Sequence, residues 1–252
     1  MKILLLSPHI DDAVLALGGT LTRLTAGNEV KVYNFFGVSA STRLQAKFPV
    51  PLVVLVRWTE ELVVSTAEGY SFRNLLFSDT SLTRRKGHPD EHLLKSLTSA
   101  VTWAVRRERP DILVVPLAVG EHPDHLAIFD TVSNCIARGE VDVEKCLFYE
   151  DMWYSARTEP AQRAKAASQQ LATALKPVLI DVTRQTRHKR KLCQMYGSQY
   201  PMSAKKIKGV FEYAKRLRGD VPTRDGISFE RIWVPSPSGR LASTAAVIAP
   251  GN

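Results

Sequence analysis

A histidine and two aspartates lie together near the amino end of the chain, and a second group of the same residue types lies far along it. His9, Asp11 and Asp12 stand in the segment PHIDDAV, and the second group reads EHPDH at 121–125. Imidazole nitrogens and carboxylate oxygens are the usual ligands of a divalent metal such as zinc, and a catalytic zinc site keeps one open position for water. These residue types therefore predict a metal site suited to hydrolysis.

Asp11 and Asp12 also allow a second interpretation, because acidic residues at the start of a helix cap its N–H groups. If His9 and Asp12 instead bind a metal, Asp11 stands where it can take a proton from the metal-bound water. The second group favours the metal site, since His122 and His125 supply further imidazoles.

The elements around the two groups repeat one pattern. Each group follows a short apolar run, at 3–6 and at 112–117, and each precedes a segment with apolar residues at helical spacing. A continuous apolar run suits a strand buried on both faces of a parallel sheet. The carboxyl ends of such strands meet at one edge of the sheet, where ligands bind. We therefore expect the two loops to converge there.

The rest of the chain continues the alternation. Further strands are predicted at 29–36, 75–78, 145–149, 178–182 and 229–234, and helices at 52–68, 93–109, 126–138, 183–196 and 210–217, whereas 158–176 suits a helix or a long surface excursion. This order predicts a Rossmann-like α/β fold, with a mostly parallel sheet and helices on both faces.

Residues 1–235 are predicted to form a single domain. The tail at 236–252, rich in Pro, Ser, Gly and Ala, is expected to be partly disordered. Gly18 and Gly19 fall inside the first helix, so dinucleotide binding of the usual kind is not expected.

The two motifs carry a resemblance to a known family. PHIDDAVLALGGTL at 8–21 and EHPDHLAI at 121–128 resemble the H-P-D-D and H-x-D-H motifs of the LmbE/PIG-L family of zinc-dependent N-deacetylases. A looser similarity runs through 57–61, 79, 149–151, 181–183 and 196–199 to about Trp233. The resemblance implies an enzyme that removes the N-acetyl group of an N-acetylglucosamine-like amino sugar or its conjugate.

The resemblance also implies roles for individual residues. His9, Asp12 and His125 would bind the metal, Asp11 would be the general base, and His122 would stabilise or protonate the tetrahedral intermediate. The metal would be Zn²⁺, although the same ligands also suit Fe²⁺, Mn²⁺ or Co²⁺.

Two further residues belong to this expected site. Arg57 would point towards the substrate, with a surface salt bridge as its alternative. Asp124 is placed with the substrate-binding residues, and its alternatives are orienting a histidine or serving as a turn residue after Pro123.

Three positions depart from the family pattern. Ile10 stands where the family often has Pro, and Ala13 stands where many members have Glu. No tyrosine precedes the second motif, where some members have one. Val119, Gly120 and Glu121 stand there instead, and whether Glu121 replaces that tyrosine is open.

Three other segments are candidates for parts of a substrate site. The polar stretch 37–51 suits a substrate loop or an ordinary surface insertion. Trp153 and Tyr154 follow a strand and would line the pocket or pack in the core. In GHPDEH at 87–92, the acids are expected to begin a helix, with metal binding as the alternative, and His88 is a candidate substrate contact.

Composition narrows the class of protein. The net charge of +9 comes largely from the segment 184–218, which is interpreted as a solvated helix face. The sequence shows no known nucleic-acid-binding module, so nucleic-acid binding is not expected, although an anionic or conjugated amino sugar would suit the charge. No apolar stretch long enough for a membrane span occurs. The amino terminus has no secretory pattern, and the three cysteines are widely spaced, so a cytoplasmic protein is predicted.

Two other functions share much of this pattern. A metal hydrolase that cuts a different amide or an ester would use the same ligands. A non-catalytic sugar-binding protein of the same fold would not need Asp11, whose presence beside two expected ligands argues against it.

Overall fold

The first strand, β1 (Lys2–Ser7), lies inside the sheet and is covered on both faces. Ile3 and Leu5 pack with one layer of helices, whereas Leu4 and Leu6 pack with the other, and none of the four is more than 2% exposed. The computed structural model describes residues 1–42, 48–199, 205–217 and 227–236. The continuous apolar run therefore forms the doubly buried strand that the sequence predicts.

Seven strands form one sheet in the order β3-β2-β1-β4-β5-β7-β6. Their bounds are β2 (Glu29–Asn34), β3 (Ser71–Asn74), β4 (Ile112–Pro116), β5 (Cys146–Tyr149), β6 (Ala174–Asp181) and β7 (Phe229–Ser236). Neighbouring strands from β3 through β5 are parallel, while β7 is antiparallel to both β5 and β6. The predicted α/β fold with a mostly parallel sheet is confirmed.

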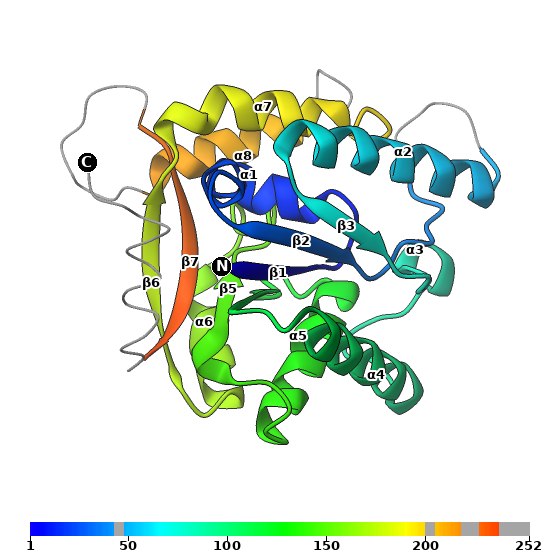
Figure 1. The fold of residues 1–252 in the computed structure, drawn as a ribbon, viewed down its shortest axis with the longest axis vertical. Helices are drawn as coiled ribbons and strands as arrows, with labels where there is room; N and C mark the ends of the chain where they lie inside the picture. Colours follow the sequence, from blue (N-terminus) through cyan, green and yellow to red (C-terminus); the bar gives the residue numbers. More distant parts are fainter. Residues whose placement is uncertain (43–47, 200–204, 218–226, 237–252) are drawn as a thin grey trace.

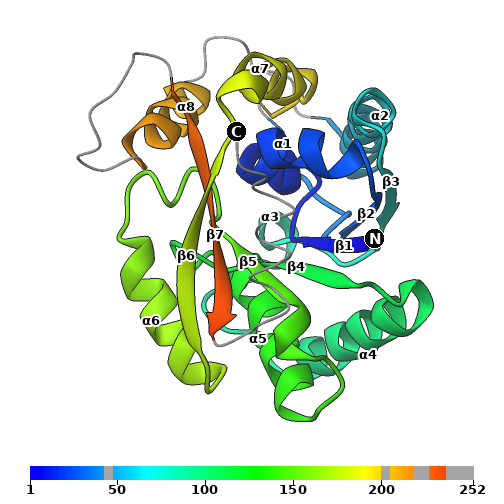
Figure 2. The same cartoon turned by 60° about the vertical axis from the view of Figure 1, so that its left-hand side comes forward.

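Helices cover both faces of this sheet (Figures 1 and 2). One layer holds α1 (Asp12–Thr25), α2 (Val50–Glu68), α7 (Thr186–Met195) and α8 (Lys205–Arg216), and the other holds α4 (Glu91–Glu108), α5 (Pro123–Ala137) and α6 (Pro160–Gln170). A short helix, α3 (Thr80–Thr83), follows the β3 edge. Each layer seals its own apolar core against the sheet, and this arrangement holds the strand ends in fixed positions.

Two predicted elements were wrong in detail. The third strand is Ser71–Asn74 rather than 75–78, where Leu76 and Ser78 make only isolated bridges. This strand lies at the sheet edge with half of its side chains exposed, so it lacks the apolar run that marks the central strands. The strand predicted at 178–182 is longer, at Ala174–Asp181. The tail beyond Ser236 lies outside the described residues, and the single domain ending at 235 stays a prediction.

Helix α1 carries Asp11 at its N-cap and Asp12 at its first position, and it is bent. Leu17 has non-helical dihedral angles, and the N–H groups of Gly19 and Thr20 donate to the buried Glu230 carboxylate at 2.9 and 2.8 Å. A Cβ on Gly18 would lie 2.8 Å from Cγ of Lys189, so only glycine allows this approach of α7. Within the described part of the chain, no helix is both long and apolar enough to cross a membrane.

Candidate active site

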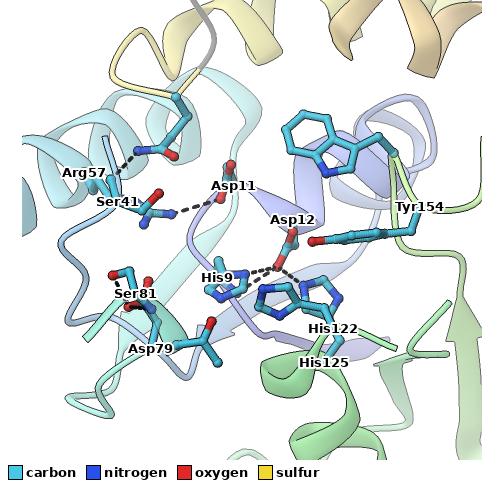
Figure 3. Close-up of a pocket in the computed structure, with 13 residues that line it drawn as sticks. His9, Asp11, Asp12, Ser41, Arg57, Asp79, Ser81, His122, His125 and Tyr154 are labelled. Atoms are coloured by element: carbon cyan, nitrogen blue, oxygen red, sulfur yellow. Dashed lines mark hydrogen bonds and ion pairs between the residues drawn. The ribbon is translucent and has the colours of Figure 1, made fainter. Parts of the chain in front are cut away.

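The loops after β1 and β4 bring the two motifs together at one edge of the sheet (Figure 3). His9 lies in the first loop, His122 is the N-cap of α5, and His125 lies in the first turn of that helix. Side chains from both motifs and from five other segments line a single cavity: His9, Asp11, Asp12, Ser41, Arg57, Asp79, Thr80, Ser81, His122, His125, Trp153, Tyr154 and Gln199. The predicted convergence is confirmed.

One carboxylate oxygen stands between two histidines. Oδ2 of Asp12 lies 3.0 Å from Nδ1 of His9 and 3.2 Å from Nε2 of His125. The other ring nitrogen of each histidine meets a second carboxylate: Nε2 of His9 lies 2.9 Å from Asp124, and Nδ1 of His125 hydrogen-bonds to Asp151. Metal-binding histidines are oriented in this way, with the outer N–H donated to a carboxylate. The three inner atoms thus fit a divalent metal ion.

The start of α1 explains why Asp12 faces inward. The His9 backbone N–H donates to Oδ2 of Asp12 at 2.9 Å, which turns this carboxylate back over the loop. Asp11 is the N-cap residue, but its side chain makes no capping hydrogen bond. Neither acid therefore follows the helix-capping alternative.

His122 completes a group of three imidazoles. Its ligand atom and those of His9 and His125 lie within 4.8 Å of one another. Nδ1 of His122 accepts a hydrogen bond from the Asp124 backbone N–H at 3.3 Å, so the ring hydrogen belongs on Nε2. Burial and the neighbouring His125 and His9 lower the pKa of His122 to about 4. His122 is therefore a neutral hydrogen-bond donor.

The cluster is electrostatically paired. Burial disfavours the charged form of each group, but the two histidines outweigh it and hold the pKa of Asp12 well below its ordinary value. Burial by itself would lower the pKa of His9, but the Asp12 and Asp124 carboxylates outweigh burial. The net effect raises the pKa of His9 to about 9. The raised pKa values of His9 and His125 put positive charge at the place that suits a cation.

Arg57 reaches the cavity from α2. Its Nη2 lies 3.1 Å from Oδ1 of Asp11, and both side chains are buried, at 4% and 7% exposed. This pair is inside the site rather than on the surface, so the surface salt bridge considered for Arg57 is not what forms. The guanidinium stands beside Asp11 on the wall opposite Tyr154 (Figure 3).

Asp124 lies beneath the cavity rather than in its wall. Its side chain is fully buried, and its Oδ2 accepts hydrogen bonds from the backbone N–H and the hydroxyl of Thr80, each at 3.0 Å. Arg85 pairs with its Oδ1. The direct substrate contact expected for Asp124 does not fit this burial, whereas the alternative of orienting His9 does.

Sequence reasoning assigned no role to Asp151, the partner of His125. Asp151 follows β5, the next strand along the sheet after β4, and its other oxygen accepts from the Val119 backbone N–H at 2.8 Å. The position of Asp151 in the sequence could have indicated this role. An acid that closely follows a third buried strand lies at the same edge of the sheet as the two motifs.

The structure shows where three candidate substrate contacts lie. Trp153 and Tyr154 both line the cavity, and each also packs against a core. His88 is 71% exposed, pairs with Asp130 and is not part of the cavity wall. The neighbouring Asp90 caps α4 by accepting from the Leu93 N–H at 2.8 Å, as predicted.

Glu121 lies outside the active-site cavity, whereas part of the predicted substrate loop lines it. Glu121 is exposed and lines a separate cavity with Gly120 and Arg163, so it does not replace the missing tyrosine. Ser41 of the predicted substrate loop lines the active-site cavity, where its carbonyl accepts from Gln199 Nε2 at 2.9 Å. Residues 43–47 of that loop lie outside the described residues.

Fold and site together define a metal-dependent hydrolase of the open α/β type. Residues 4–136, just over half of the chain, match the model of the PIG-L family, described as GlcNAc-PI de-N-acetylase. The chain therefore belongs to the PIG-L family, and the predicted enzyme class, an N-deacetylase, is confirmed.

Known proteins of similar sequence and structure agree with this assignment. A 2'-N-acetylparomamine deacetylase from Streptomyces fradiae is 27% identical, over 94% of this chain and 91% of that protein. A deacetylase of the teicoplanin biosynthesis pathway has a TM-score of 0.73 at 20% identity, covering 95% of this chain and 100% of its own. N,N'-diacetylchitobiose deacetylase from Pyrococcus horikoshii has a TM-score of 0.67 at 20% identity, covering 95% and 88%. The two solved structures share the fold of this chain.

Proposed function

We propose that this protein hydrolyses the N-acetyl group of an amino sugar or amino-sugar conjugate to acetate and the free amine, with zinc as its metal. One observation carries the proposal. Oδ2 of Asp12 is met by inner nitrogens of His9 and His125, whose outer nitrogens are held by Asp124 and Asp151. We assign His9, Asp12 and His125 as the metal ligands, because this arrangement leaves His122 and Asp11 to face the substrate.

Asp11 is the proposed general base. When bound, the metal would lower the pKa of a water ligand to about 7 and polarise the amide carbonyl. Asp11 neighbours Asp12 in sequence, and its carboxylate lies in the cavity wall beside the Arg57 guanidinium. From there Asp11 takes a proton from the attacking water and returns it to the nitrogen of the departing amine.

His122 is the proposed oxyanion donor. The Asp124 N–H holds Nδ1 of His122 as an acceptor, so the Nε2–H is the group available to the substrate. A preorganised N–H directed at the developing negative charge strengthens its hydrogen bond in the transition state. Protonation of the amine by Asp11 then suits the neutral state of His122 better than protonation by His122 itself.

The wall opposite Tyr154 suits a sugar. Hydroxyl, guanidinium and carboxylate groups lie on the side of the cavity away from Tyr154, from Ser41, Arg57, Asp79 and Ser81 (Figure 3). Gln199 adds an amide beside Ser41, and the lining also includes the aromatic Trp153. Polar groups of this kind hydrogen-bond ring hydroxyls, and an aromatic face packs against the apolar side of a pyranose. The similarity to deacetylases of paromamine and diacetylchitobiose supports the same substrate class.

Two alternatives use part of the same site. A hydrolase for a different amide or an ester would share all of the assigned ligands and would be separated only by substrate screening. A sugar-binding protein without catalysis does not require a buried carboxylate at Asp11, and the Arg57–Asp11 pair within the cavity therefore favours an enzyme.

The test combines metal analysis with acetate release. Purified protein is reconstituted with Zn²⁺, Fe²⁺, Mn²⁺ or Co²⁺ and assayed with N-acetylglucosamine, N,N'-diacetylchitobiose and 2'-N-acetylparomamine. The parent is compared with His125→Ala and Asp11→Asn. We expect His125→Ala to lose metal and activity, and Asp11→Asn to keep its metal but lose at least about a hundredfold in kcat.

The outcomes separate the alternatives. Metal without acetate release from any of these sugars would favour a different amide or ester. A parent that takes up none of the four metals would contradict the catalytic proposal and support the binding protein. Full activity in Asp11→Asn would remove the assignment of the base.

A further inference from the structure

We propose that Tyr154 is a further substrate-contacting residue, whose hydroxyl donates a hydrogen bond to the acetamide oxygen from the side of the cavity opposite Arg57. This inference rests on the proposed function, since it assigns a second donor to the same reaction. Neither the two sequence motifs nor the metal ligand set includes Tyr154, which comes from the turn after β5.

The space that the Tyr154 ring occupies is made by Gly120. Gly120 has a φ of +79°, and a Cβ built on it would lie 2.5 Å from Cβ of Tyr154 and 2.8 Å from Cγ. No side chain at position 120 is compatible with this ring position, because real Cβ atoms do not approach so closely. In the loop of the second motif, the ring of Tyr154 therefore occupies the space that a side chain at position 120 would fill.

The ring lies over the imidazoles of the site. Its centroid is 5.9 Å from that of His122 and 5.7 Å from that of His125, and its hydroxyl points toward Asp12 (Figure 3). Trp153 and Tyr154 both line the cavity. A phenol hydroxyl carries one hydrogen to donate, and this position places that donor in the cavity beside the expected metal ligands.

The turn that carries Tyr154 is fixed to the metal site. The Asp151 carbonyl accepts from the N–H of Ser155 at 3.1 Å and from its hydroxyl at 2.9 Å, while the Asp151 carboxylate holds His125. The same carboxylate binds the Val119 N–H, next to Gly120. One residue thus fixes both the ring and the space that receives it, as preorganisation of a donor requires.

The first test is Tyr154→Phe, which keeps the ring and removes only the hydroxyl. It is assayed on whichever of the three acetylated sugars the parent hydrolyses fastest, together with metal content and thermal unfolding. We expect kcat to fall about tenfold to a hundredfold, because one of several oxyanion contacts is lost. KM, bound metal and melting temperature should stay close to those of the parent.

The kinetic split decides between roles. A rise in KM with unchanged kcat would mean that the hydroxyl binds substrate and transition state equally, which overturns the oxyanion role. Loss of metal in Tyr154→Phe would mean a structural role at the ligands and would overturn the inference as well. If the parent releases no acetate, the proposed function fails, whereas a fully active Tyr154→Phe beside an active parent removes this inference alone.

A second variant tests the space rather than the hydroxyl. Gly120→Ala should displace the ring and lower kcat about as much as Tyr154→Phe, and the double variant should be no worse than either single one. Gly69→Ala is the matched control, since Gly69 has a φ of +78° and no atom within 4 Å of a Cβ built there. It carries the same backbone strain without the clash, so it should keep the parent kcat. Additive losses in the double variant would contradict the coupling of Gly120 to Tyr154.

Discussion

Nζ of Lys189 lies 2.7 Å from Oε1 of Glu230, and both side chains are buried against the bend of helix α1. The same ammonium group donates to the Ala16 carbonyl at 3.1 Å, while Glu230 accepts from the N–H groups of Gly19 and Thr20. The bend at Leu17 interrupts the hydrogen bonds within the helix. The side chains of Lys189 and Glu230 provide hydrogen-bond partners for the backbone groups at the bend. Its place differs from the solvated helix face that the basic segment 184–218 suggested.

Lys189→Met should destabilise the protein by about 3–5 kcal/mol, because removing one partner of a buried ion pair leaves the other charge buried and uncompensated. Urea unfolding followed by circular dichroism measures the change. Lys191→Met is the control, since Lys191 is exposed on the same helix and its loss should alter the free energy of unfolding by less than about 0.5 kcal/mol. Equal effects of the two substitutions would refute the role of the pair.

Asp151→Asn should weaken metal binding about tenfold to a hundredfold, because the carboxylate that orients His125 is lost. Competition with a chromophoric chelator measures the metal affinity. Asp130→Asn is the matched control, since Asp130 lies on the same helix as His125 but pairs with the exposed His88. A metal affinity that drops equally in both variants would point to a general effect on α5 instead.

Metal should stabilise the folded protein through the assigned ligands. At a free Zn²⁺ concentration one hundred times its Kd, the free energy of unfolding should rise by about 2.7 kcal/mol. His125→Ala should show almost none of this gain, whereas His92→Ala, which changes an exposed histidine of α4, should show all of it. Thermal unfolding with and without Zn²⁺ makes the comparison, and equal stabilisation of both variants would exclude His125 as a ligand.

The parts predicted correctly from sequence depend on short-range patterns. Ile3 to Leu6 form an unbroken apolar run, so the buried strand and the loop that follows it could both be located. The same holds for β4 and the second motif. Two loops after parallel strands must share one edge of the sheet, and the meeting of His9 with His125 followed from that rule.

The parts that were missed depend on contacts between distant segments. Asp151 meets His125 because β5 lies beside β4. Its position after a buried strand indicates the sheet edge, but not which histidine it contacts. Lys189 is buried because Gly18 allows α7 to approach α1 closely, which a count of basic residues cannot reveal. In the edge strand β3, three of the four residues are polar and every side chain is exposed or half-exposed, so its sequence resembles that of a loop.

Glu61 should make stability depend on pH. Its carboxylate is fully buried and accepts hydrogen bonds from Tyr196 at 2.6 Å and from Tyr70 and Asn34 at 3.2 Å each. Burial raises the pKa of Glu61 to about 7, despite these hydrogen bonds, from an ordinary value of 4.5. The folded protein therefore holds this proton more tightly than the unfolded chain does.

The sign follows from that difference. Between pH 4.5 and about pH 7 the folded state binds more protons at Glu61 than the unfolded state, so stability falls as pH rises through this window and is level above it. Glu61→Gln imitates the protonated acid at every pH. Relative to the parent, this variant should be nearly unchanged at pH 4.5 and gain up to about 3 kcal/mol at pH 8. Urea unfolding at both pH values measures the change, with Glu91→Gln as a control because Glu91 is exposed. A Glu61→Gln curve that runs parallel to the parent across this range would show that the carboxyl titrates normally.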